Sequence, residues 1–195
     1  MCSVYDELDI TLGARADWPY FARWHYRSEN IGPVRFVTLL WHAERPIGIC
    51  VFTAPALSLA ARNHYFGRSG RWSRLTLRAL NRQLVCLARV VLNPTYRGAG
   101  LGGRFVRRSC ELCPFPWIES LAQLGQFHQF LERAGFARIN TPARKRRPRA
   151  RHSDLYCVPT TRAKKRLISP ETSIKSEFAA PVYYVFDNRS AMPSH

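Results

Sequence analysis

The chain has 195 residues, of which 30 are Lys or Arg and 13 are Asp or Glu, so its formal net charge is +17. A composition that is 46% hydrophobic and 12% aromatic can form a buried core, which excludes a wholly disordered chain. No uninterrupted apolar run approaches the roughly 18 residues of a membrane-spanning helix. The N-terminus lacks a basic stretch followed by an apolar one, so we expect a single cytoplasmic domain over 1–195 with no membrane partner.

Hydrophobic periodicity and turn residues divide the chain into strands and helices. Runs rich in apolar and β-branched residues predict strands over 34–41, 47–52, 84–92, 117–121 and 181–187. Helical spacing and capping signals predict helices over 16–27, 73–83, 104–112 and 127–134. Gly135 is well placed to end the last of these helices.

Positive charge is concentrated late in the chain. Residues 138–166 contain 11 Lys or Arg and a single acid, Asp154. Prolines argue against a long helix there, and a predicted strand follows, so we interpret residues 140–178 as a basic insertion between late strands. Such clustering favours a polyanionic partner, whereas a solvated loop without a binding role is the alternative.

The six cysteines do not form a metal-binding motif. Cys110 and Cys113 make one CxxC pair, but no second pair and no His pair follows at the spacing of a zinc site. Cys50 and Cys86 lie in apolar runs and are typical of core residues. We therefore expect neither a metal site nor a disulfide framework.

A glycine-rich turn over 97–103 (RGAGLGG) joins the strand over 84–92 to the next predicted helix. Glycines let backbone N–H groups at a helix N-terminus approach an anion, and the helix dipole adds to the attraction. The turn has four glycines, at 98, 100, 102 and 103, rather than the three of the dinucleotide fingerprint G-x-G-x-x-G, and no Gly-Lys-Ser/Thr is present. The pattern predicts a phosphate cradle, and a turn that only connects strand and helix is the alternative.

The segment 90–102 (VVLNPTYRGAGLG) resembles the strand, turn and loop of the GNAT superfamily of acyl-CoA-dependent N-acetyltransferases. A second segment, 130–136 (FLERAGF), resembles a later helix of that family that ends in Gly-Phe. With the flanking strands the resemblance covers most of 17–187. It implies an α/β (α+β) fold with a central mixed, mostly antiparallel sheet flanked by helices and a basic insertion before the last strand.

The same resemblance implies acetyl-CoA as the cofactor. The glycine turn would hold the pyrophosphate, and the strand before it would pair with the pantetheine arm. These implied roles fall on Val90, Val91, Leu92, Arg97, Gly98, Gly100, Gly102 and Gly103. The strand over 117–121 would diverge from its neighbour and open a slot for the acyl group.

Enzymes of this family usually let the acceptor amine attack directly, so the protein supplies a base and a proton for the leaving thiolate. The family's usual proton donor is a Tyr at the position of Leu131, which cannot donate a proton. Glu119, on the strand that should line the slot, and His128, at the start of the following helix, are therefore candidate catalytic residues. A surface carboxylate and a structural imidazole are the alternatives for these two side chains.

Three polar residues follow the aromatic segment in which the family usually builds its acceptor site. We expect Tyr26 to take part in catalysis and His25 and Arg27 to contact the acceptor. Simple packing of Tyr26 and solvation of Arg27 are the alternatives.

The basic insertion borders the acceptor side in this fold, so we expect Arg146, Arg147 and Arg149 to bind a nucleic acid, DNA or RNA. The resulting hypothesis is an acyltransferase whose acceptor is an amine on nucleic acid. Alternatives are a small-molecule or protein N-acetyltransferase, and a relative of the Mom-type enzymes that modify DNA adenine in bacteriophages by other chemistry. A non-enzymatic GNAT relative that only binds nucleic acid is the remaining alternative.

Overall fold

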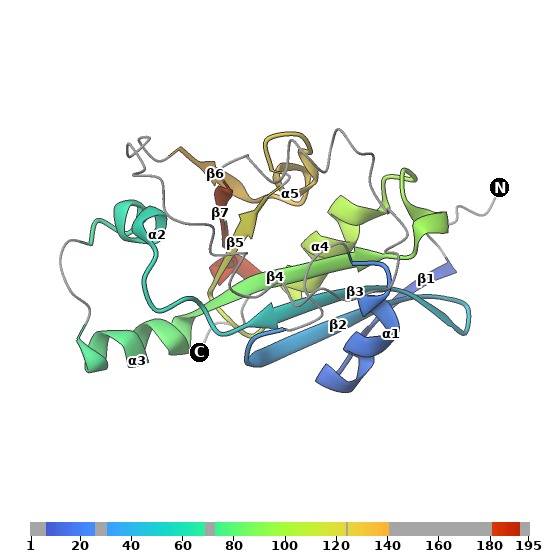
Figure 1. Ribbon diagram of the computed structural model, residues 1–195, viewed down its shortest axis with the longest axis horizontal. Helices are drawn as coiled ribbons and strands as arrows, with labels where there is room; N and C mark the ends of the chain where they lie inside the picture. The colour runs from blue at the N-terminus through green and yellow to red at the C-terminus, as the bar shows by residue number, and fades with distance from the viewer. Residues whose placement is uncertain (1–6, 26–30, 69–72, 124, 141–180, 192–195) are drawn as a thin grey trace, which may run out of the picture.

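The computed structural model describes residues 7–25, 31–68, 73–123, 125–140 and 181–191, which build one seven-stranded sheet (Figure 1). The strands are β1 (Leu8–Leu12), β2 (Val34–His42), β3 (Arg45–Thr53), β4 (Leu84–Leu92), β5 (Trp117–Ala122), β6 (Ala137–Ile139) and β7 (Val182–Asp187). Their order across the sheet is β1-β2-β3-β4-β5-β7-β6. All neighbours are antiparallel except β4 and β5, so the sheet is the mixed, mostly antiparallel one that the sequence predicts.

Helices cover both faces of this sheet. They are α1 (Trp18–Ala22), α2 (Ala60–Tyr65), α3 (Arg74–Gln83), α4 (Leu101–Glu111) and α5 (Phe130–Arg133), with short 3-10 turns η2 (Arg15–Asp17), η3 (Pro94–Tyr96) and η4 (Arg189–Ala191). The largest core cluster packs α4 and α5 on one face, and smaller clusters pack α1 and α2 on the other. None of the helices in the described ranges is long and apolar enough to cross a membrane.

Helices cover both faces of β3, and the side chains of this strand alternate between the two faces. Cys50 and Phe52 belong to the core beneath α4, whereas Ile49 and Val51 belong to the core beneath α1. All four are fully buried, as is Phe21 of α1. The central strands are thereby fixed in register, and the end of β4 that carries the glycine turn is fixed with them.

The structure corrects three predicted helix boundaries. Within the described residues the helix predicted over 16–27 is limited to α1, since the chain leaves α-helical hydrogen bonding where the Trp24 N–H donates to the Phe21 carbonyl oxygen, and residues 26 and 27 lie outside them. The helix predicted over 127–134 is the single turn α5. The helix predicted over 104–112 begins three residues earlier, at Leu101, because Gly100 adopts a left-handed conformation that starts it.

Three elements were not predicted from the sequence, namely β1, α2 and β6. Each is short, and each is defined by its neighbours: β1 pairs with β2, β6 pairs with β7, and α2 packs Ala61 against Tyr183. Of the predicted basic insertion 140–178, all but the first residue lies outside the described residues. The chain enters that segment from β6 and returns from it in β7.

Candidate active site

The connection between β4 and α4 leaves the sheet in a fixed direction. The Asn93 N–H donates to the Ile47 carbonyl oxygen of β3 (2.8 Å), and the Asn93 side-chain oxygen accepts from the Thr95 N–H (3.1 Å). Pro94 occupies the first turn of η3, where a missing N–H costs nothing. The backbone is therefore ordered up to the first residue of the glycine turn.

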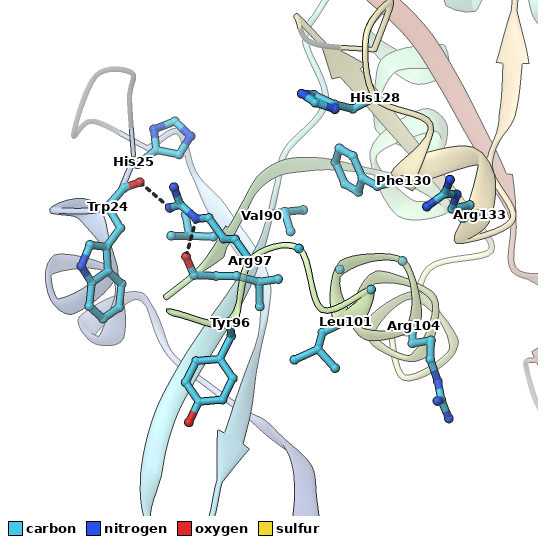
Figure 2. A pocket seen from close by; sticks show the side chains of 16 residues that line it. Trp24, His25, Val90, Tyr96, Arg97, Leu101, Arg104, His128, Phe130 and Arg133 are labelled. Atoms are coloured by element: carbon cyan, nitrogen blue, oxygen red, sulfur yellow. Dashed lines mark hydrogen bonds between the residues drawn. The ribbon is translucent and has the colours of Figure 1, made fainter. Parts of the chain in front are cut away.

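Arg97 fastens this turn to two other parts of the fold. Its Nε donates to the Leu92 carbonyl oxygen (3.0 Å), and its Nη2 donates to the Trp24 carbonyl oxygen (3.0 Å), as Figure 2 shows. Burial lowers the pKa of the guanidinium below its ordinary value. Arg97 thus joins the end of β4 to the chain beyond α1, and it brings His25 to the same cavity.

Two glycines of the turn have backbone conformations that other residues rarely adopt. Gly98 has a φ of +87° and Gly100 has a φ of +76°. Gly103 is needed for a different reason, because an added Cβ there would lie 3.3 Å from the Arg133 Cβ and 3.4 Å from the Phe130 carbonyl oxygen. The first turn of α4 and the single turn of α5 therefore approach each other closely.

The N-terminus of α4 opens onto the cavity. The helix buries one face, formed by Leu101, Phe105, Val106, Ser109 and Cys110, and this packing sets its direction. Its first N–H groups have no acceptor within the helix, and its first turn contains no acidic side chain. Backbone donors and the helix dipole therefore make this end of α4 attractive to an anion.

β4 and β5 separate soon after they begin. They pair only where Leu84 to Cys86 face Trp117 to Glu119, after which β5 pairs with β7 alone. The Ser120 hydroxyl donates to the Leu87 carbonyl oxygen (3.1 Å) just beyond the last shared pair. The end of β4 toward the glycine turn consequently has one edge without a strand, the divergence that the resemblance implies.

A cavity of about 690 Å³ lies where this open edge, the glycine turn and the N-terminus of α4 meet (Figure 2). Its lining residues are Trp24, His25, Val90, Val91, Leu92, Tyr96, Arg97, Gly98, Gly100, Leu101, Gly102, Gly103, Arg104, His128, Phe130 and Arg133. All eight residues predicted to hold the cofactor are among them. His25 and His128, predicted for the acceptor and for catalysis, are also there.

The lining is cationic. Arg97, Arg104 and Arg133 contribute guanidinium groups, His25 and His128 contribute imidazoles, and no lining residue of the described chain is Asp or Glu. In Figure 2 His25 and His128 lie on opposite sides of the Val90 end of the cavity. This arrangement suits an anionic ligand with a long apolar part, since Val90 to Leu92 supply an apolar wall.

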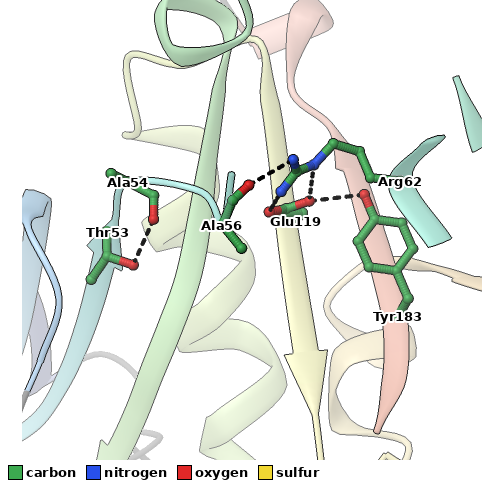
Figure 3. Close-up of polar contacts among 6 residues, drawn as sticks. All are labelled: Thr53, Ala54, Ala56, Arg62, Glu119 and Tyr183. Carbon is green, nitrogen blue, oxygen red and sulfur yellow. Dashed lines mark hydrogen bonds and ion pairs between the residues drawn. The ribbon is translucent and has the colours of Figure 1, made fainter. Parts of the chain in front are cut away.

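Glu119 does not line the cavity, which corrects the expectation that it faces the slot. Its carboxylate is 1% exposed and lies beneath α2. Arg62 donates to it twice, from Nε to Oε2 (2.9 Å) and from Nη2 to Oε1 (2.6 Å), and the Tyr183 hydroxyl donates to Oε2 (3.0 Å) (Figure 3). Arg62 also donates from Nη1 to the Ala56 carbonyl oxygen (2.8 Å). With these donors around it, Glu119 has a structural role at the separation of β4 from β5.

The geometry of this cluster shifts the pKa values of Arg62 and Tyr183. Burial alone would lower the pKa of Arg62, but the hydrogen bonds and charge of Glu119 raise it above its ordinary value. Burial, and then the charge of Glu119, raises the pKa of the Tyr183 hydroxyl. Arg62 and Tyr183 are therefore a cation and a neutral phenol at neutral pH, and both act as donors to the carboxylate.

Leu131, at the family's usual proton-donor position, is 2% exposed and belongs to the main core. The cavity is reached from this segment by His128 and Phe130 instead. Tyr184 is no substitute, since its hydroxyl is buried, donates to Glu132 (2.8 Å) and has a pKa that burial raises to about 12. The imidazole of His128 is the titratable group that this segment presents to the cavity.

Tyr96 also lines the cavity, with its hydroxyl turned away from it. The Tyr96 hydroxyl forms a hydrogen bond with Nδ1 of His42 (2.7 Å), and Nε2 of that ring forms one with Glu7 (3.0 Å). The Tyr96 ring is therefore a wall of the cavity, and its hydroxyl has a structural partner outside it. The other predicted site residues, namely Tyr26, Arg27, Arg146, Arg147 and Arg149, lie outside the described residues.

Six residues of the lining were not predicted from the sequence, namely Trp24, Tyr96, Leu101, Arg104, Phe130 and Arg133. Tyr96 and Leu101 lie inside the glycine-turn motif and could have been found from it. Arg104 and Arg133 could not, because their convergence depends on the close packing of α4 against α5 at Gly103.

No protein-family model matches the chain, and no curated protein matches it. Among solved structures, mutant forms of the spermidine/spermine N-acetyltransferase from Vibrio cholerae are similar, with a TM-score of 0.52 and 8% identity over 95% of this chain and 96% of that one. The aminoglycoside acetyltransferase AAC(6′)-Ib in complex with coenzyme A and kanamycin is also similar, with a TM-score of 0.50 and 15% identity over 94% of this chain and 96% of that one.

At these identities the similarity concerns the fold. The chain has the fold of the GNAT N-acetyltransferases, as the sequence predicts. The elements of that fold on which the cavity depends are the separation of β4 from β5 and the glycine turn that leads into α4.

The Arg62–Glu119 pair makes a testable contribution to stability. Arg62→Met should lower the free energy of unfolding by about 3–5 kcal/mol, because it leaves a buried carboxylate without its cation. Replacing both partners, as in Arg62→Met with Glu119→Leu, should cost less than Arg62→Met alone. Urea unfolding of the wild type, the single variant and the double variant measures these free energies.

Arg107→Met is the matched control, since it removes the exposed partner of Glu111 on α4. It should cost less than about 1 kcal/mol. Equal effects of Arg62→Met and Arg107→Met would contradict the structural role assigned to the buried pair.

Proposed function

We propose that the protein is an N-acyltransferase that takes its acyl group from acetyl-CoA. The observation that carries this proposal is the cationic cavity formed by the glycine turn, the N-terminus of α4 and the open edge of β4. The fold similarity to acetyltransferases supports it.

The residues present fit this cofactor. Gly98 and Gly100 hold left-handed conformations that expose backbone N–H groups, and no carboxylate in the first turn of α4 repels a phosphate. Arg104 and Arg133 add positive charge beside the turn, and the edge of β4 offers backbone groups to the amides of the pantetheine arm. When bound, acetyl-CoA supplies the acyl group as a thioester.

In this proposal an imidazole side chain transfers the proton. The acceptor amine must lose a proton as its nitrogen forms a bond with the acyl carbon, and the cavity lining has no carboxylate to take it. His128 lies on an exposed segment at the cavity, where its imidazole is placed to accept that proton. His25, on the side of α1, orients the acceptor, and a water or the protonated His128 returns a proton to the departing sulfur.

The acceptor we propose is an amine carried by a nucleic acid. Spermidine, spermine and kanamycin, which stand in the names of the two similar structures, are polycations. The net charge of +17 repels a polycation and attracts a polyanion. A small-molecule acceptor remains the alternative favoured by those two structures.

Gly100→Glu should raise the dissociation constant for acetyl-CoA by about 100-fold or more, because it places a negative side chain at the anion site. Gly67→Glu is the matched control. Gly67 also has a positive φ, of +61°, but an added Cβ there meets nothing within 4 Å and it lies outside the cavity. Calorimetric titration with acetyl-CoA measures both, and equal binding by the two variants would contradict the proposed cradle.

Labelled acetyl-CoA should transfer its acetyl group to DNA or tRNA at low salt and leave spermidine and kanamycin unlabelled. The physical reason is the net charge of +17, which attracts a polyanion and repels polyamines. Scintillation counting of the separated acceptors measures the transfer. Label on spermidine or kanamycin alone would replace the nucleic-acid acceptor by the small-molecule alternative.

His128→Gln should reduce the transfer rate by about 100-fold or more while leaving the affinity for acetyl-CoA unchanged, because it removes the base and no phosphate contact. His64→Gln is the control, since His64 is an exposed imidazole of α2 outside the cavity. Single-turnover assays with the acceptor from the preceding experiment measure both variants. Full activity of His128→Gln would contradict the assignment.

A further inference from the structure

One long part of the chain carries positive charge without any acid. Residues 45–110 contain twelve arginines and no Asp or Glu, so this charge is separate from that of the basic insertion. Several of these arginines are used inside the fold: Arg62 in the buried ion pair, Arg97 at the glycine turn, and Arg107 and Arg108 in ion pairs on α4. The arginines of α3 have no such role within the described part of the fold.

Three arginines form a row along α3. Arg74, Arg78 and Arg82 are spaced four residues apart, which places them on one side of a helix over about 12 Å of its length. All three are exposed. Within the described part of the chain they make no hydrogen bond or ion pair, and α3 itself contains no acid that could neutralise them.

The row faces away from the rest of the molecule. The other side of α3, formed by Thr76, Ala79, Leu80 and Gln83, lines a groove against the body of the protein that includes Trp117. The helix is also capped at its start, where the Ser73 hydroxyl accepts from the Thr76 N–H (3.2 Å). The arginines are thus presented on a preformed helix, which Figure 1 shows at the edge of the molecule.

We propose that the arginine row of α3 binds the phosphate backbone of duplex nucleic acid. Three guanidinium groups on a fixed helix match a run of phosphates, and such contacts position a duplex without reading its sequence. Single-stranded sites usually add aromatic side chains on which bases stack, and α3 has none. An anionic membrane fits less well, because lipid binding needs a broad apolar helix face, whereas Leu75 is the one large apolar side chain of α3 that is exposed and Leu80 lines the groove.

The position of α3 suits a partner that is held while the cofactor is bound. α3 ends at Gln83, β4 begins at Leu84, and the glycine turn follows at the other end of that strand. Nine residues of β4 separate the two by about 30 Å, so a duplex on α3 leaves the anion site to the cofactor. The inference deepens the proposed nucleic-acid acceptor, but its test measures binding without acetyl-CoA and so stands or falls separately from catalysis.

The test compares two triple variants that remove the same charge. One is Arg74→Gln, Arg78→Gln and Arg82→Gln on α3, where glutamine keeps the helix propensity. The other is Arg15→Gln, Arg35→Gln and Arg45→Gln, three exposed arginines that are neither on α3 nor in the cavity lining. Fluorescence anisotropy with a labelled duplex DNA gives the affinity of each full-length protein over a range of salt concentrations.

The α3 variant should bind the duplex about tenfold more weakly or worse at low salt. The slope of its log association constant against log salt concentration should be smaller in magnitude by about 2 to 3. The other variant should keep most of the affinity and slope of the wild type. Three results would overturn the proposal: no binding of duplex by the wild type, equal losses in both variants, or an α3 loss seen with anionic vesicles and not with DNA. Circular dichroism of each variant confirms that α3 and the fold are retained.

Discussion

The separation of β4 from β5 is the constraint on which the cavity depends. β5 pairs with β7 along its whole length but with β4 only as far as Glu119, so one edge of β4 is left for another occupant. The Arg62–Glu119 ion pair lies at this last shared position and ties α2 to β5. Because an unpaired buried charge is costly, the pair stabilises the fold at the place where the two strands part.

The use of acidic residues elsewhere explains the charge of the cavity. Glu119 is held by Arg62, Glu132 accepts from the Tyr184 hydroxyl, and Glu111 forms ion pairs on α4. The carboxylates that the structure describes in this part of the fold therefore stabilise it rather than face a ligand. What faces the ligand is a set of arginines, histidines and backbone N–H groups, and this set accounts for both the proposed cofactor and the proposed base.

The features that could be predicted from the sequence are local ones. β4 is rich in Val and Leu, and the glycine turn after it begins α4, so both were predicted, and the eight residues proposed for the cofactor line the cavity. The role of Glu119 was not found, because its partner Arg62 is 57 residues away and lies on a helix with no strong pattern of its own. β1 and β6 were missed for the same reason, since pairing with a neighbouring strand defines them.

In the proposed complex the backbone of the glycine turn binds the phosphates of coenzyme A. NMR titration of the ¹⁵N-labelled protein with coenzyme A and, separately, with pantetheine tests it most directly. The account predicts that coenzyme A shifts the amide resonances of Gly98, Gly100, Gly102 and Gly103 most strongly, and that pantetheine, which lacks the pyrophosphate, binds far more weakly. Equal affinity for the two ligands, or unshifted glycine amides in the presence of coenzyme A, would contradict it.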